Sequence, residues 1–396
     1  IELPEDIARL DVKAKPLKSF PYRRSIAEDN IIYKAFKLMS EAESPILIAG
    51  NGAIRKRSSR QLREFCERTN IPVVTTFMGK GAVNCESDYC LSTVGLGAID
   101  FGDIAIKNSD LVITLGYDMV EYHPKLWRTN SSAKIIHIDF EAAEIDEYYI
   151  PEVEIIGDLA HSLSVLNKII DTEGIKSYDN TNVKKLRASL KKDNENYKDD
   201  KSIGLIKPQK FLYDLRNFLG KDDILISDVG AHKMWVAREY NCAVPNTCLI
   251  SNGFCTMGFA LPGSIGAKMA FPKKKIVSIN GDAGFLMNVQ ELETAVRYKI
   301  NIIVIVWLDG SYGLIKWKQQ LQYEGNHSDL KFNNPNFKFL SDSFGMWGIE
   351  LTRAEELSSA LKEASKQKGP AIIGIPPLFK YLSISFLFIL FILESL

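Results

Sequence analysis

The chain has 396 residues, of which 46% are hydrophobic and 25% charged. This composition supports sizeable packed cores and excludes a wholly disordered or collagen-like chain. The 49 basic residues balance the 49 acidic ones, so the overall positive charge typical of nucleic-acid-binding proteins is absent. The six cysteines form no C-x-x-C pair, which argues against a disulfide scaffold and favours a reduced, cytoplasmic compartment.

Short apolar runs alternate with helical patterns over residues 25–175, which predicts α/β units around a parallel sheet. Helices are expected over residues 31–39 and 59–69. The predicted strands are residues 45–53, 71–77, 111–118 and 134–139. The first strand ends in the sequence GNGAIRK, which has some glycines of a dinucleotide loop but not the full G-x-G-x-x-G. A structural glycine turn is therefore the favoured interpretation.

A second α/β block is expected over residues 207–378, after a polar segment at residues 176–206 that has no strand signal and is predicted to be an exposed helix or linker. Its predicted strands are residues 223–228, 248–252, 275–281, 302–309 and 370–376, and its predicted helices are residues 260–269, 288–299 and 354–366. The predicted fold class is therefore α/β, with two doubly wound parallel-sheet domains.

The two ends differ from the rest of the chain. Residues 381–393 are thirteen uncharged residues, fewer than the ~20 that a membrane-spanning helix needs. A membrane anchor is thus less favoured than a buried or non-native segment, and residues 379–396 are described as an atypical apolar tail. At the other end, residues 1–3 are expected to be the last piece of a strand whose partners lie upstream.

Two aspartates follow consecutive predicted strands of the second block: Asp282 after the strand ending at Gly281, and Asp309 after the next. Two carboxylates at neighbouring strand ends could hold Mg²⁺ against a diphosphate. The helix expected from about Asn288 would point its positive N-terminus at this place. The alternative is a pair of ordinary loop aspartates that cap helices, and spacing alone does not choose between the two.

The run GDAGFLMNVQELETAV, followed by IVWLDGSYGLIKWKQ, resembles the signature of thiamine-diphosphate enzymes. DVGAHKMW and SNGFCTMGFALPGSIGAK are similar to two further segments of the acetolactate synthase branch. In the first block, GNGAIRK, TTFMGKGA, GYDMVEYHPKLW and IIHIDFEAAEID resemble the middle domain of that branch. The resemblance covers residues 1–376, and it implies a middle domain followed by a domain that binds thiamine diphosphate and Mg²⁺.

The resemblance also implies roles for individual residues. Asp282 and Asp309 would bind Mg²⁺ by their side chains, and Ser311 by its backbone carbonyl. Met257 would be the apolar wedge that bends the cofactor, although a methionine by itself more often packs in a core. The other implied cofactor-binding residues are Gly230, Ala231, His232, Cys255 through its carbonyl, Gly281, Ala283, Gly284, Tyr312, Gly313, Leu314 and Ile315.

Some positions bear on specificity or depart from the family pattern. Tyr312, Leu314 and Ile315, with Lys318, would also select the substrate. Ala283 stands where the family usually has glycine, so a positive φ there would be disfavoured. Ala231 stands where glutamine is commoner, so one side-chain contact is expected to be missing.

The implied reaction joins two pyruvates to 2-acetolactate with loss of CO₂, through the ylid of thiamine diphosphate. FAD is not expected, because GYDMVEYHPKLW has no arginine before Arg128 and resembles the catabolic, FAD-free type. A homodimer or homotetramer is implied, with no nucleic-acid partner and no membrane.

The family's catalytic glutamate comes from a separate N-terminal domain across a subunit interface. That domain would precede Ile1, so residues 1–24 are expected to be its end plus a linker, and this chain alone is expected to be inactive. Two alternatives stay open. One is another thiamine-diphosphate 2-oxo acid decarboxylase, and the other is a truncated, non-catalytic cofactor-binding fragment.

Overall fold

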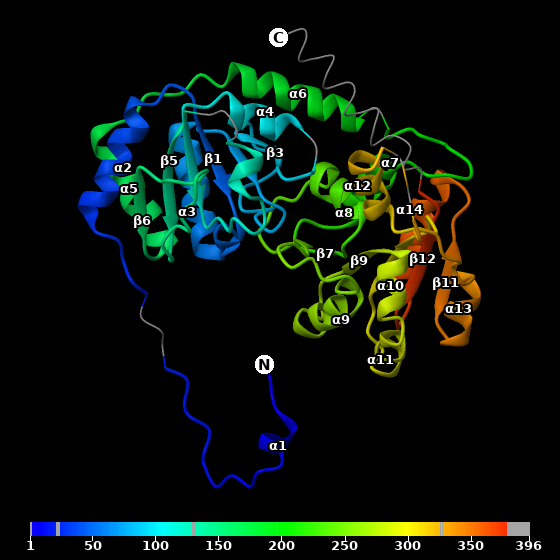
Figure 1. The fold of residues 1–396 in the computed structure, drawn as a ribbon. Coiled ribbons are helices and arrows are strands. Elements are labelled where there is room, and N and C mark those ends of the chain that lie inside the picture. Colours follow the sequence, from blue (N-terminus) through cyan, green and yellow to red (C-terminus); the bar gives the residue numbers. More distant parts are fainter. Residues whose placement is uncertain are drawn as a thin grey trace.

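The computed structural model describes residues 2–20, 24–97, 99–128, 132–195, 197–324, 326 and 328–377. They contain two six-stranded sheets, each with parallel strands and flanking helices, and the two sheets lie side by side in Figure 1. The predicted α/β class with two doubly wound sheets is confirmed. The apolar run at residues 381–393 lies outside the described residues.

The first sheet has the strand order β3-β2-β1-β4-β5-β6. Its strands are β1 (Pro45–Ala49), β2 (Val73–Thr75), β3 (Cys90–Thr93), β4 (Leu111–Leu115), β5 (Lys134–Asp139) and β6 (Val153–Ile156). Its helices are α2 (Asp29–Glu41), α3 (Lys56–Thr69), α4 (Phe101–Lys107) and α5 (Leu159–Glu173). The sequence analysis did not predict β3 and β6, because these four-residue edge strands have too little apolar pattern to stand out.

Helix α6 (Thr181–Glu195) lies in the segment predicted to be an exposed helix or linker. It packs on α4 and β3, as Figure 1 shows, and buries Leu186 and Leu190. The helical alternative is therefore correct, but the helix is docked on one face.

The second sheet has the order β11-β12-β10-β9-β7-β8. Its strands are β7 (Ile224–Ser227), β8 (Cys248–Ile250), β9 (Ile276–Gly281), β10 (Ile303–Trp307), β11 (Trp347–Glu350) and β12 (Ala371–Ile375). Its helices are α7 (Pro208–Phe218), α8 (Ala231–Glu239), α9 (Ala260–Ala270), α10 (Asp282–Met287), α11 (Glu291–Arg297), α12 (Gly313–Gln322), α13 (Phe337–Ser343) and α14 (Leu357–Ser365). The central strands β10 and β12 are apolar and buried, as is typical of a parallel sheet covered on both faces. Strand β9 is equally buried but contains Ser278 and Asn280.

The order of the second sheet changes direction between β7 and β9. The chain passes from β7 outward to β8, then crosses to the other side of β7 for β9 and β10. Such a switch point leaves a crevice at the carboxyl ends of the strands, where α/β proteins bind ligands. The loops after β7, β9 and β10 all open there.

One predicted helix begins in the wrong place. The helix expected from about Asn288 is two helices: α10 begins at Asp282 itself, directly after β9, and α11 begins at Glu291. An acidic residue in the first turn is favourable for a helix, so the chain enters α10 as soon as the strand ends. The N-terminus nearest the two aspartates therefore belongs to α10.

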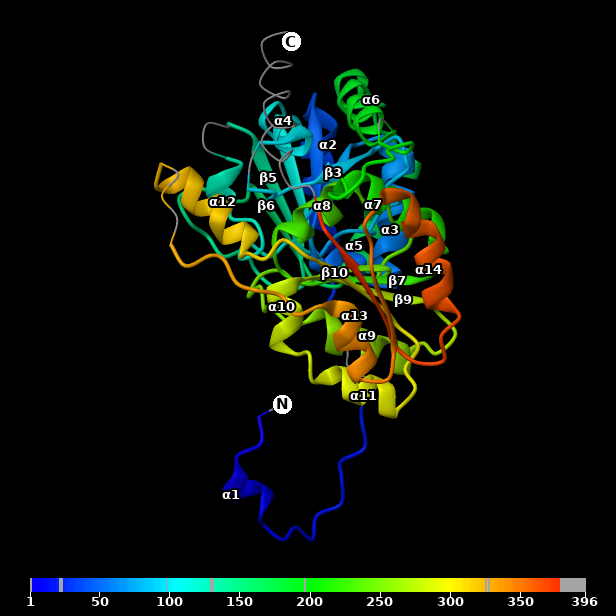
Figure 2. The ribbon, with the colours of Figure 1, turned by 90° about the vertical axis from the view of Figure 1, so that its right-hand side faces the viewer.

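The N-terminal segment also differs from the prediction. Residues 2–4 are not in a strand, and α1 (Glu5–Ala8) is a single helical turn. Figure 2 shows this segment extended away from both sheets. Within the described ranges, the helices are all too short or too polar to cross a membrane.

Candidate functional site

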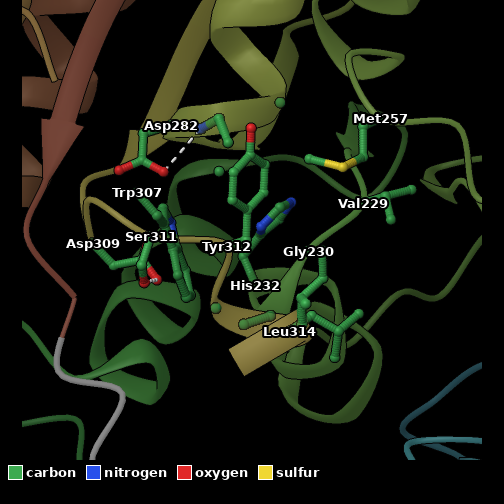
Figure 3. Close-up of a pocket in the computed structure, with 16 residues that line it drawn as sticks. Val229, Gly230, His232, Met257, Asp282, Trp307, Asp309, Ser311, Tyr312 and Leu314 are labelled. Carbon is green, nitrogen blue, oxygen red and sulfur yellow. Dashed lines mark hydrogen bonds between the residues drawn. The ribbon is translucent and has the colours of Figure 1, made fainter. Parts of the chain in front are cut away.

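A pocket lies at the carboxyl ends of β7, β9 and β10 (Figure 3). Apart from Cys255, all the residues predicted to bind cofactor or metal line it. The lining residues are Val229, Gly230, Ala231, His232, Met257, Gly281, Asp282, Ala283, Gly284, Trp307, Asp309, Ser311, Tyr312, Gly313, Leu314 and Ile315. The fold thus brings four separate segments of the chain together at the switch point.

Asp282 is the most firmly held carboxylate of the pocket. It is 1% exposed, and its Oδ2 accepts hydrogen bonds from the Gly310 amide at 2.7 Å and from Asn334 Nδ2 at 2.6 Å. Its Oδ1 accepts one from the Ala283 amide at 2.9 Å. These donors fix the orientation of the carboxylate.

Asp309 lies on the same side of the pocket, as Figure 3 shows. Burial and the negative charge of Asp282 raise the pKa of Asp309 to about 7. Two carboxylates held this close repel each other when both are ionised. A divalent cation between them would remove the repulsion, so the pair has the chemistry of a site for a hard cation.

The loop after Asp309 holds the third predicted metal ligand. The Ser311 hydroxyl donates to Asp309 Oδ2 at 3.3 Å, and the Ser311 backbone forms an antiparallel bridge with Lys331. A Cβ at Gly313 would lie 2.8 Å from Asp309 Oδ2, so a larger residue there would push the Asp309 carboxylate aside. No group of three His, Cys, Asp or Glu side chains in the described ranges is arranged to hold a metal. A cation here would need further oxygen ligands from the Ser311 carbonyl, a bound phosphate or water.

His232 follows Gly230 at the start of α8 and is 2% exposed. Burial lowers its pKa to about 3, so the imidazole is neutral near pH 7. Its Nε2 is buried and has no hydrogen-bond partner among the described residues. Buried polar atoms are normally paired, and a ligand oxygen or water in the pocket could provide the partner.

The two small residues after Asp282 sit in α10. Ala283 has a helical backbone, so the positive φ that would have been disfavoured for alanine is not required. Gly284 is needed for space, because a Cβ there would lie 2.5 Å from Asp228 Oδ2. Because residue 284 has no side chain, the start of α10 can lie against Asp228 at the end of β7.

Met257 lies across the pocket from the two aspartates in Figure 3. The loop that carries Met257 is hydrogen-bonded to Asp228, the residue directly after β7. The carboxylate of Asp228 accepts hydrogen bonds from the amides of Gly258 and Phe259 at 3.0 and 3.1 Å. Asn288 Nδ2 donates to the Gly258 carbonyl at 2.8 Å. The thioether is thus carried on a loop fixed at three points.

Cys255 is the predicted residue that does not line the pocket. Its backbone has φ of 53°, and its Sγ donates to Asn252 Oδ1 at 3.4 Å and accepts from Lys233 Nζ at 3.4 Å. The predicted role was for its carbonyl, and that role stays a prediction.

The sequence analysis missed four residues of the site. Val229 and Trp307 line the pocket, Asp228 anchors the Met257 loop, and Asn334 orients Asp282. Asp228 could have been noticed as a carboxylate at the end of an apolar strand. Asn334 has no such signal, because it lies in an irregular segment 52 residues after its partner.

The GNGAIRK turn of the first sheet is built by close backbone approach. The Gly52 amide donates to the Gly116 carbonyl at 2.9 Å, and a Cβ at Gly50 would lie 2.3 Å from that oxygen. The glycines let the loops after β1 and β4 touch, which agrees with the predicted structural turn.

Comparison with known proteins supplies independent evidence. The model of the central domain of thiamine pyrophosphate enzymes matches residues 32–166, and the model of their C-terminal TPP binding domain matches residues 228–375. The chain is 31% identical over 381 residues to an acetolactate synthase of Bacillus subtilis, covering 95% of this chain and 66% of that protein. It is 30% identical over 378 residues to a catabolic acetolactate synthase of Raoultella terrigena, covering 95% and 67%.

A probable acetolactate synthase large subunit of Methanococcus aeolicus is 33% identical over 396 residues, covering 94% of this chain and 66% of that protein. The chain thus spans about two thirds of the length of the curated relatives it matches.

Proposed function

Because the chain belongs to the thiamine pyrophosphate enzymes, we propose that its pocket binds the diphosphate end of thiamine diphosphate through Mg²⁺, in an enzyme that makes 2-acetolactate from pyruvate. The observation that carries the proposal is the pair Asp282 and Asp309, held at neighbouring strand ends in one pocket. Relatives named acetolactate synthase, one of them catabolic, support this reaction over others of the family.

The residues present fit the group. Asp282, Asp309 and the Ser311 carbonyl provide hard oxygen ligands for Mg²⁺. His232 offers a buried, unpartnered Nε2, and the first turns of α8 and α10 face the pocket with amides that favour an anion. The bound cofactor supplies the carbanion chemistry. The chain's own part is to neutralise the diphosphate, exclude water and support the organic end on Met257.

We propose further that the enzyme works without FAD. Residues 116–127 contain no arginine. The first arginine after them is Arg128, whose guanidinium already donates to the carbonyls of Tyr148 and Ala133 at 3.0 and 3.2 Å. The Arg128 guanidinium is therefore already paired within the chain and is not free to bind a flavin pyrophosphate. The purified protein should be colourless, and a stoichiometric visible absorbance of flavin would contradict this.

We propose that a second subunit covers the mouth of the pocket in a homodimer or homotetramer. Large apolar side chains are exposed near the pocket: Phe254 is 97% exposed, Met287 47% and Ile315 47%. Exposed apolar groups gathered around a site are typical of an interaction surface. Light scattering should give at least twice the mass of one chain, and a monomer at micromolar concentration would argue against it.

The cofactor proposal is tested with Asp282→Ala. Titration calorimetry of thiamine diphosphate with Mg²⁺ should show at least a hundredfold loss of affinity, because the diphosphate would face an incomplete cation site. Asp222→Ala, an exposed aspartate outside the pocket, is the control and should bind normally. Unchanged affinity in Asp282→Ala would overturn the assignment.

The reaction is tested by the product from pyruvate. Acetoin after acid treatment indicates acetolactate, whereas acetaldehyde would identify a simple decarboxylase.

A further inference from the structure

Four cysteines gather where the two sheet domains meet, away from the pocket. Cys85 and Cys90 come from the first domain, and Cys242 and Cys248 from the second. Cys85 Sγ and Cys242 Sγ are 3.8 Å apart, and the thiols of Cys90 and Cys248 lie close enough to affect the pKa values of Cys85 and Cys242. Cysteines far apart in sequence are thus within contact distance across a domain boundary.

Hydrogen bonds around the pair fix the two backbones against each other. The Cys85 amide donates to the Cys242 carbonyl at 3.1 Å. Arg63 Nη2 donates across the boundary to the Ala243 carbonyl at 2.8 Å, and Lys80 Nζ donates to the Ala237 carbonyl at 2.7 Å. A disulfide needs the sulfur atoms to close to about 2.05 Å, and the clamped backbones leave only small side-chain movements to achieve this.

Cys85 has the surroundings of a reactive thiol. Hydrogen bonds from Cys242 and Cys90, with the charge of buried Lys80, lower the pKa of Cys85 against the effect of its burial. Thiolate, not thiol, reacts with oxidants. Cys85 is also partly exposed and, with Lys80 and Cys90, lines a polar cavity by which a small oxidant can reach it.

We propose that Cys85 and Cys242 are a redox pair that forms a reversible disulfide between the two domains when the protein meets a hydroperoxide. The Cys85 thiolate attacks the peroxide, breaking its O–O bond, and becomes a sulfenic acid while one hydroxide or alkoxide leaves and takes up a proton. The Cys242 sulfur then attacks the Cys85 sulfur and displaces the hydroxyl as water. With hydrogen peroxide, two thiols are oxidised, one peroxide is reduced and two waters are formed.

The bond would join positions 157 residues apart in the chain. It would fasten the segment after α8, the helix whose first turn carries His232 of the pocket, to the first domain. Disulfides in reducing compartments are usually transient and sensing rather than structural, which suits a thiol pair held at contact distance but unbonded. The inference concerns thiol chemistry and does not depend on the proposed cofactor.

The test is peptide mapping of the folded full chain. Hydrogen peroxide is added, free thiols are alkylated, and a digest is analysed by mass spectrometry without reductant. We expect a peptide pair linked through Cys85 and Cys242, a fall in free thiols from six to four, and recovery of all six with dithiothreitol. The oxidised protein should also unfold several degrees higher, because the cross-link restricts the unfolded chain.

Variants separate this pair from its neighbours. Cys242→Ser should abolish the inter-domain peptide, whereas Cys66→Ser, which removes a thiol buried in the core of the first domain, should leave it unchanged. Lys80→Met should slow its formation, because it removes a positive charge that favours the Cys85 thiolate. Six alkylatable thiols after peroxide, or bonds only between Cys85 and Cys90 or between Cys242 and Cys248, would overturn the proposal. Mapping of the wild-type chain decides this even if a variant fails to fold.

Discussion

Asp282 and Asp309 are identical in chemistry but differ in what surrounds them. Asp282 accepts hydrogen bonds from three donors, whereas Asp309 accepts a hydroxyl bond from Ser311 and faces the charge of its neighbour. One carboxylate is therefore oriented before any ligand arrives, and the other has its charge disfavoured until a cation binds. Residues that hold the first carboxylate should matter for cofactor affinity without touching the cofactor.

Asn334→Ala tests that idea. Removing the donor to Asp282 Oδ2 should weaken Mg²⁺-dependent thiamine diphosphate binding roughly tenfold or more, in the range found for groups that orient metal ligands. Calorimetry at several Mg²⁺ concentrations measures this, and added Mg²⁺ should partly restore binding. Asn333→Ala, the exposed neighbour, should bind as the wild type does. Equal affinities for the two variants would mean that the hydrogen bond does not orient the ligand.

Glu121 is a second carboxylate shaped by its surroundings. Burial raises its pKa to about 7, and its carboxylate accepts hydrogen bonds from the Met78 amide at 3.2 Å. An unfolded glutamate titrates near 4.3, so between about pH 4.3 and 7 the folded state binds more protons. The contribution of Glu121 to stability is therefore greatest at low pH and is lost as the pH rises through that window.

Glu121→Gln should accordingly stabilise the protein at pH 8, by about 3–4 kcal/mol from the size of the shift. The advantage should shrink as the pH falls toward 5, where the wild-type carboxyl is already protonated in the folded state. Urea unfolding at both pH values measures the difference, with Glu41→Gln, on the exposed end of α2, as the control. A variant no more stable than wild type at pH 8 would show that ionising Glu121 in the folded protein costs little free energy of folding.

At the scale of elements, α6 is a largely polar helix that nevertheless packs against the first domain. Most of its surface is charged, but Leu186 and Leu190 are buried, and Arg187 between them donates to the carbonyls of Glu86, Ser87 and Cys90. The helix thus holds the segment before β3 in place by both apolar and polar contacts.

Leu190→Ala should destabilise the first domain by about 2–4 kcal/mol, because a large buried side chain is replaced by a cavity. Ser189→Ala, at a half-buried position of the same helix where the hydroxyl donates to the Lys185 carbonyl one turn earlier, should change stability by less than about 0.5 kcal/mol. Denaturant unfolding compares the two. Equal stabilities would mean that α6 is only loosely attached.

At the scale of the whole molecule, a buried ion pair joins the two domains. Arg238 of α8 donates from Nε to Asp100 Oδ2 at 2.9 Å, with side chains 6% and 0% exposed. Buried ion pairs contribute little more to the free energy of folding than well-packed apolar residues would. Removing one partner, however, leaves the other charge buried and unpaired, which is strongly destabilising. The pair therefore makes the two domains depend on each other.

Arg238→Met should cost about 3–5 kcal/mol of unfolding free energy, and Asp100→Asn in the same chain should recover part of the loss. Arg297→Met breaks a surface pair whose side chains are 56% and 58% exposed, so it should cost less than about 1 kcal/mol. Chemical denaturation followed by tryptophan fluorescence measures all three variants. A cost for Arg238→Met no larger than for Arg297→Met would mean that the domains are not coupled through this pair.

The sequence by itself determined the fold class, the central strands and the two aspartates that follow β9 and β10. Its resemblance to thiamine-diphosphate enzymes added the pocket residues 230–232 and 311–315, but not Asp228 and Val229 directly after β7. The strands inside a buried parallel sheet are mostly apolar, and the residues after them emerge at one edge of the sheet, so local pattern was sufficient to place the strands and the two aspartates. The same reasoning placed the first helix after β9 too late and overlooked the short edge strands β3, β6 and β11, whose patterns are too brief to read.

Only the tertiary structure decided which distant residues meet. Asn334 reaches Asp282 across 52 residues, Asp228 anchors the loop of Met257, and Cys85 lies against Cys242. These contacts depend on the order in which the strands join the sheets and on how the domains pack, and neither leaves a periodic trace in the chain. The pKa values near 7 of Asp309 and Glu121 have the same origin, because burial and neighbouring charge exist only once the chain is folded.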